Sequence, residues 1–184
     1  MNTNRGLTLR FFQALCVILY FASSLTIARG AEISDLVMNT SQGYLLLTVR
    51  IGDVIAGEVN AGAPDELSAT IIYSIALYEV KPLWFDKKIA QHTATNTLKH
   101  DPLKKEYRLL RSWDNGPPPL VDSLNQARLL MAEIKNLKLM PLAALEKGRN
   151  YQIRVQAVCQ DKNAYVFSPS GCFKTDWHTV DFTF

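Results

Sequence analysis

Residues 69–113 read ATIIYSIALYEVKPLWFDKKIAQHTATNTLKHDPLKKEYRLLRSW and predict three successive β-strands. In the first, residues 69–77, large apolar side chains fall at every second position, so one face of the strand is expected to be buried. Lys81-Pro82 ends it, because proline has no N–H to donate to a strand ladder. A threonine-rich strand at 87–99 and a third strand at 106–113 follow. Their short connections favour an antiparallel meander.

Strand patterns also lie on both sides of this stretch. Two expected strands, 31–38 and 44–51, form an opening hairpin across a turn that ends in Gly43. The clearest strand is 151–159, where apolar and polar residues alternate throughout, and a last strand is expected at 173–184. We expect residues 160–171, which are polar, to form the loop between them.

The hydrophobic period changes after the run DNGPPP at 114–119, which stops the preceding strand. Ser123 followed by Gln126 fits a capping box. Apolar residues then recur at helical spacing and predict one amphipathic helix: Leu120, Leu124, Ala127, Met131 and Ile134. A second short helical turn is expected at 141–147, and another short helix at 53–60.

These patterns predict a mainly β fold, α+β by element count. We expect an antiparallel, sandwich-like domain of about seven strands with the amphipathic helix packed on it. After an N-terminal segment is set aside, 154 residues remain, which is the length of one domain with a sizeable core.

That N-terminal segment, residues 1–30, has the order of a secretory signal peptide. Two arginines precede an apolar run at 11–22, and Ala28 and Gly30 are small residues at positions −3 and −1 of a cut after Gly30. The apolar run is short for a membrane span, which needs about 20 residues. We expect cleavage after about Gly30 and a periplasmic or exported domain at 31–184. The alternative is a retained anchor in the inner membrane.

Charge excludes one class of partner. Residues 1–30 contain three arginines and no acid, so the formal net charge falls from +3 to 0 for the mature chain. No nucleic acid partner is expected, because a nucleic-acid face would persist as a positive excess. Residues 31–80 carry −6 and residues 81–111 carry +5. We interpret these zones as neutralising each other on one surface; the alternative is a basic face for an anionic envelope partner.

The mature chain contains two cysteines, Cys159 and Cys172. An exported protein meets an oxidising compartment, so an even pair predicts a disulfide. A closed loop of about 14 residues is worth about 3 kcal/mol in the loop-entropy model. Two free thiols are the alternative. A metal site is disfavoured, because two sulfurs need further ligands and no histidine lies close by in the sequence.

The remaining motifs predict no enzyme, metal or cofactor. His92, His100 and His178 each lack a second histidine or cysteine at metal-ligand spacing. There is no Gly-x-Ser-x-Gly elbow, phosphate-binding glycine loop or His-Glu-x-x-His motif.

An acidic residue lies close to each tryptophan in the sequence: Asp86, Asp114 and Asp176. A tryptophan ring beside a carboxylate could bind a carbohydrate by stacking. Large aromatic side chains at strand ends more often seal a core. We therefore expect four aromatic residues to pack in the core, with a ligand platform as the alternative: Trp84, Phe85, Trp113 and Trp177.

Runs along the whole mature chain carry a family resemblance, among them LYEV at 77–80, WFDKKIA at 84–90, LKKEY at 103–107, LMAEI at 130–134, LEKG at 145–148, YQIRV at 151–155 and FKTDWHTVDF at 173–182. They resemble a family of exported proteobacterial proteins that is catalogued as a domain of unknown function (four-three-nine-zero type). The resemblance covers nearly the whole mature chain. It implies an envelope location and brings no catalytic residue with it. Relatives tend to have a longer, aromatic-rich insert where this chain has its short polar loop.

We expect a non-catalytic periplasmic module that binds or scaffolds another envelope component, most readily a protein. Contact with a membrane is expected only if the N-terminal segment is retained. The contact surface would be a strand edge or a face within 81–111: Trp84, Asp86, Lys87, Lys88, Lys104 and Lys105.

Two alternatives stay open. The first is a ligand-sensing domain that feeds a membrane signalling protein, with a pocket lined by Trp84, Trp113 or Trp177. The second is an enzyme acting on envelope glycan through Asp86 or Asp176. Such an enzyme needs two carboxylates about 5–9.5 Å apart that face one cleft.

Overall fold

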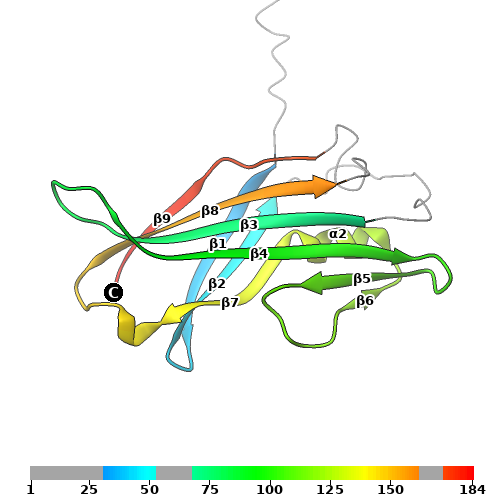
Figure 1. Cartoon of the computed structure of the whole chain (residues 1–184), viewed down its shortest axis with the longest axis horizontal. Coiled ribbons are helices and arrows are strands. Elements are labelled where there is room, and N and C mark those ends of the chain that lie inside the picture. Colours follow the sequence, from blue (N-terminus) through cyan, green and yellow to red (C-terminus); the bar gives the residue numbers. More distant parts are fainter. Residues whose placement is uncertain (1–30, 53–67, 162–171) are drawn as a thin grey trace, which may run out of the picture.

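The structure, a computed structural model, describes residues 31–52, 68–161 and 172–184 (Figure 1). The predicted signal segment 1–30, the short helix expected at 53–60 and residues 162–171 of the expected loop lie outside the described residues. Within them the chain forms nine strands, one α-helix and one 3-10 helix: β1 (Glu32–Ser41), β2 (Tyr44–Gly52), β3 (Ser68–Glu79), β4 (Lys87–Asp101), β5 (Glu106–Arg111), β6 (Leu120–Val121), α2 (Leu124–Met131), β7 (Glu133–Pro141), η1 (Leu142–Ala144), β8 (Asn150–Asp161) and β9 (His178–Thr183).

The strands form two antiparallel sheets. Sheet A has the order β1-β2-β7, and sheet B has the order β6-β5-β4-β3-β8-β9. Figure 1 shows the strands of sheet A running across the long strands β3, β4 and β8 of sheet B. The mainly β, antiparallel, sandwich-like fold is confirmed, and so are the opening hairpin β1–β2 and the meander β3–β4–β5.

The turn of the opening hairpin follows from its sequence. Ser41 pairs with Tyr44, which leaves Gln42 and Gly43 as a two-residue loop. Both have a positive φ, 51° and 77°, as in the type I′ turns that match the twist of two antiparallel strands. Glycine adopts that conformation without strain.

One continuous core lies between the sheets. The alternation predicted for β3 and β8 holds, and the buried side chains of β2 face them across the sandwich. Full burial of each large aliphatic side chain stabilises the fold by about 1.5–3 kcal/mol. The fully buried positions include Leu47, Val49, Ile71, Tyr73, Ile75, Leu77, Leu98, Leu109, Ile134, Ile153 and Val155.

The predicted amphipathic helix is present but shorter than its sequence period. Leu120 lies in the short strand β6 and pairs with Arg108 of β5. Ile134 lies in β7 and pairs with Val49 of β2. Only the middle of the periodic run is helical, because both of its ends gain strand hydrogen bonds. The expected capping box is wrong: Ser123 occupies the N-cap position, but its side chain makes no capping hydrogen bond. The helical turn expected at 141–147 is found as η1.

The described residues form nine strands, whereas the sequence predicts about seven; the two additional strands are β6 and β7. The buried residues of β7 are spaced by three and then two positions, because the strand is irregular at Asn136, where φ is 53°. Glu133 lies 3.1 Å from Arg50 of β2 and 3.0 Å from Lys135. Burial alone would raise the pKa of Glu133, but its hydrogen bonds to these two cations and their charges lower that pKa below its usual value.

Two buried polar side chains of sheet B hold the end of α2. The Tyr73 hydroxyl donates to the carbonyl oxygen of Met131 at 2.9 Å. The Asn96 amide donates to the carbonyl oxygens of Leu130 and Met131 at 3.0 and 3.3 Å. The last carbonyls of a helix lack partners within the helix, so these two residues supply them. Burial raises the pKa of Tyr73 well above its ordinary value, which keeps its hydroxyl protonated as a donor.

Candidate functional site

Residues 81–86, within the connection between β3 and β4, form the most exposed apolar feature of the described chain. We call it the β3–β4 tip. Strand pairing ends at Glu79 and Lys87, and the backbone N–H of Val80 donates to the carbonyl oxygen of Asn150 in β8. In Figure 1 the tip projects beyond β8 and β9 at the left-hand end of the sheet.

The backbone of the tip forms a turn that its sequence partly explains. The N–H of Trp84 points to the carbonyl oxygen of Lys81, 3.4 Å away. Pro82 follows Lys81, and Leu83 comes third with φ of 64°. Proline at the second position and a positive φ at the third are typical of a type II turn, which ordinarily has glycine at the third. A non-glycine residue in the left-handed region costs about 1–2 kcal/mol.

The three residues that follow Pro82 are exposed, with fractional exposures of 103% for Leu83, 76% for Trp84 and 86% for Phe85. The rings of Trp84 and Phe85 meet edge to face, with centroids 6.3 Å apart. The expectation that these aromatic residues seal the core is wrong for both, because they lie beyond the last strand pair, where the second sheet no longer covers them. It is also wrong for Trp177, which is 53% exposed, and correct for Trp113, which packs against the core.

An ion pair fixes the base of the tip. The Asp86 carboxylate lies 2.6 Å from the Arg154 guanidinium of β8. That guanidinium also lies over the Tyr78 ring, 4.2 Å from its centroid, and donates to the side chain of Gln152. Gln152 in turn donates to Asp181 of β9 at 2.7 Å. The pair is about one third exposed, so solvent screening limits it to about 1 kcal/mol. Its main effect is to fix the direction of the tip.

The lysines predicted as an interaction face divide into two groups. Lys87 and Lys88 are exposed where β4 leaves the tip, and the Lys88 ammonium lies 5.8 Å from the centroid of the Tyr78 ring. Lys104 and Lys105 lie in the β4–β5 turn, at the other end of the 15-residue strand β4. At about 3.3 Å per residue, the two groups are roughly 45 Å apart. The structure therefore brings Trp84, Asp86 and the first two lysines together and separates the last two from them.

A groove lies between β4, the β5–β6 connection and β7. Its volume is about 370 Å³, within the range of ligand sites in proteins. Trp113 lies in it, with the Arg111 guanidinium 6.0 Å from its ring centroid. The other lining residues are mostly polar: His92, Thr93, Ala94, Ser112, Asn115, Asn136, Leu137 and Lys138.

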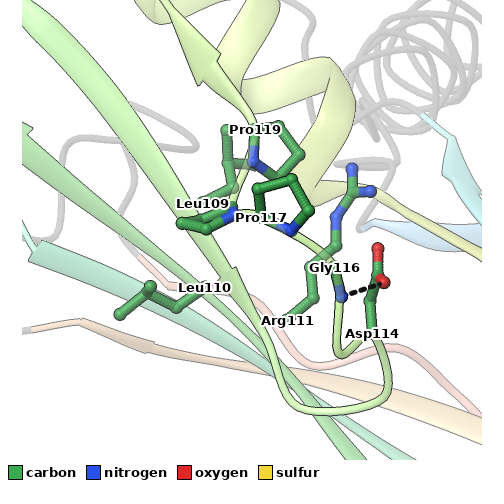
Figure 2. A pocket seen from close by; sticks show the side chains of 8 residues that line it. Leu109, Leu110, Arg111, Asp114, Gly116, Pro117 and Pro119 are labelled. Atoms are coloured by element: carbon green, nitrogen blue, oxygen red, sulfur yellow. Dashed lines mark hydrogen bonds between the residues drawn. The ribbon is translucent and has the colours of Figure 1, made fainter.

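A second, smaller hollow lies under the triple proline (Figure 2). Its volume is about 120 Å³, and it is lined by the β5 end and by residues 114 and 116–119. Figure 2 shows Arg111 and the rings of Pro117 and Pro119 around it, and the Asp114 carboxylate accepts a hydrogen bond of 2.9 Å from the N–H of Gly116. The hollow has room for a few waters.

The acids named for glycan chemistry are not found in either hollow. Asp86 is bound to Arg154, and Asp176 is exposed in the segment before β9. Asp114 is the one acid among the residues that line the two hollows. In the described ranges, no group of three or more histidine, cysteine, aspartate or glutamate side chains could hold a metal ion.

The predicted disulfide is present. Cys159 near the end of β8 is bonded to Cys172, with Cα atoms 5.2 Å apart. The backbone N–H of Cys159 also donates to the carbonyl oxygen of Phe173 at 2.9 Å. A disulfide fits an extracellular or periplasmic location. Among the residues that the structure covers, no helix has the length and hydropathy that a membrane crossing needs.

Comparison with known proteins gives one match. A family model described as "Domain of unknown function (DUF4390)" matches residues 28–181, which confirms the resemblance of the sequence. No curated protein and no solved structure matches the chain.

Proposed function

The chain belongs to the DUF4390 family, and from that premise we propose that it is an exported, non-catalytic module that binds another component of the cell envelope through the β3–β4 tip. The observation that carries the proposal is the exposure of three consecutive large apolar side chains, Leu83, Trp84 and Phe85. Export is supported by the signal-like residues 1–30, with cleavage after about Gly30 as part of the proposal, and by the disulfide.

The tip has the features of a contact surface rather than of a packing defect. Contiguous exposed apolar side chains are rare on monomers and mark interaction sites. Tryptophan is the residue most often found at the energetic centre of an interface. The Asp86–Arg154 pair and the turn at Leu83 fix the backbone of the tip before contact, which lowers the backbone freedom lost on binding.

A cross-linking experiment tests this function. A photoreactive phenylalanine analogue replaces Trp84 in the full chain, and cells are irradiated. We expect a covalent adduct at position 84. The matched control carries the analogue at Leu103, which is 95% exposed in the β4–β5 turn, and should give none. Equal adducts at both positions, or no adduct at position 84, would contradict the proposal.

The groove at Trp113 favours a second candidate function, a ligand-sensing domain. Its volume of about 370 Å³, its aromatic side chain and its amide and hydroxyl groups suit a small polar ligand. A ligand that binds the folded state raises the melting temperature. A thermal-shift screen of small polar compounds should then find a stabiliser whose effect is lost in Trp113→Ala and kept in Trp177→Ala. Equal stabilisation of both variants would remove the groove from consideration.

A further inference from the structure

The side chains of the β3–β4 tip have the chemistry of a membrane interface. Tryptophan and phenylalanine concentrate at the level of lipid headgroups, where an apolar ring meets water and polar groups. Leu83 makes almost no contact with the protein, since its side chain is 103% exposed. The turn can therefore insert into the headgroup region of a bilayer without rearranging. A stable protein interface requires about 800 Å² from each partner, and a six-residue turn is small for that purpose. A lipid interface sets no such minimum.

The charges around the tip favour an anionic surface. Lys81, Lys87 and Lys88 flank the apolar residues. The one acid within the tip, Asp86, is paired with Arg154, and Glu79 lies opposite Lys87 in the strand register. The positive side chains therefore outnumber the negative ones around the exposed apolar residues. Lysine and arginine close to a bilayer are attracted by anionic headgroups, and their long stems let the charge stay in the headgroup layer.

The opposite end of β4 provides an internal comparison. The β4–β5 turn also has exposed lysines, Lys104 and Lys105, but its one large apolar side chain is Leu103. The Asp101 carboxylate accepts hydrogen bonds from the N–H groups of Leu103 and Lys104, at 3.1 and 3.2 Å, and stays beside the lysines. The β4–β5 turn thus has two lysines beside one exposed apolar residue. The β3–β4 tip has three lysines beside three exposed apolar residues.

We infer that the envelope component bound by the β3–β4 tip is the surface of a membrane rich in anionic phospholipid, with Leu83, Trp84 and Phe85 inserted in its interface. This inference rests on the proposed function and names the partner of the same site. It assigns the membrane contact to the folded domain, whereas the sequence alone gave such contact only to a retained N-terminal segment.

Vesicle co-sedimentation of the exported form, purified after cleavage near Gly30, tests the inference. Vesicles of phosphatidylethanolamine with phosphatidylglycerol should bind the protein, and vesicles of phosphatidylcholine alone should bind it weakly. Trp84→Ser with Phe85→Ser should lower the affinity by at least about tenfold. Lys87→Glu with Lys88→Glu should lower it in dilute salt and have little effect at high salt. Circular dichroism and the melting temperature show that each variant is folded, and mass spectrometry confirms that all of them lack residues 1–30.

Matched variants at the other turn complete the design. Leu103→Ser and the pair Lys104→Glu with Lys105→Glu should bind as the wild type does. Wild-type affinity in the Trp84→Ser, Phe85→Ser double variant would overturn the inference, and so would the absence of binding by the wild type. The mass of the adduct at position 84 separates the two proposals. A lipid adduct supports both, a protein adduct alone supports the proposed function and overturns this inference, and no adduct contradicts both.

Discussion

At the scale of single residues, Leu83 has two features that lower the stability of the folded chain. Its φ of 64° belongs to the conformation that glycine adopts freely, and its side chain is fully exposed. Neither feature stabilises the folded chain. Strained residues of this kind concentrate at binding sites, where the surrounding structure holds them. The proline before it sets the turn, and the ion pair of Asp86 closes its base.

Leu83→Gly should therefore separate stability from binding. The substitution removes the left-handed strain, worth about 1–2 kcal/mol, but adds backbone freedom to the unfolded chain, worth about 0.4–1 kcal/mol in the opposite direction. We expect the free energy of unfolding in urea to be unchanged or higher by up to about 1.5 kcal/mol, while vesicle binding weakens.

The control is Leu103→Gly, which removes the same exposed side chain at a position without a positive φ. It should lower the free energy of unfolding slightly and leave vesicle binding unchanged. A loss of stability in Leu83→Gly larger than that of the control would show that the leucine side chain packs in the fold.

At the scale of elements, the sequence predicts strands well where alternation is regular and poorly where it is not. The pattern of β3 and β8 places their buried faces correctly. Leu120 and Ile134 continue the helical period of α2 but belong to the strands β6 and β7. For Ile134 the cause is the irregularity of β7, which spaces Ile134 and Leu137 by three positions, as in a helix. In β4, Asn96 lies on the same buried face as Ala94 and Leu98, and the sequence pattern gives no role to this polar residue. Its partners are helix carbonyls that are distant in sequence.

Asn96→Ala should destabilise the fold by about 1–3 kcal/mol, because it leaves the Leu130 carbonyl without the donor that Asn96 supplies and opens a gap beneath α2. The measurement is urea denaturation. Thr97→Ala, at the next position of β4, is the matched control. It removes a half-buried hydroxyl contact with Thr70 at 3.0 Å and should cost less than about 1 kcal/mol. Equal losses would mean that Asn96 does not hold the helix.

At the scale of the whole molecule, the fold class could be predicted, but the site only in part: the sequence groups Trp84, Asp86 and Lys87 together, whereas it does not predict the exposure of the tip. Short-range patterns identify strands and hairpins, and Lys81-Pro82 correctly indicates that β3 ends just before it, at Glu79. Such patterns do not show that β7 pairs with β2 across about ninety residues, and so they do not show where the two sheets stop covering each other. That boundary decides the environment of Trp84 and Phe85.

The Cys159–Cys172 disulfide is the one covalent link across the described fold, and it joins β8 to the segment that leads into β9. A separation of 13 residues corresponds to about 3 kcal/mol of stabilisation through the unfolded chain. Reduction of the wild type should therefore lower the free energy of unfolding by about 2–4 kcal/mol. Cys172→Ser should show that loss without reductant and no further change with it. If reduction does not alter the wild type, the two sheets hold β9 without the disulfide, and the disulfide is not required for the stability of the fold.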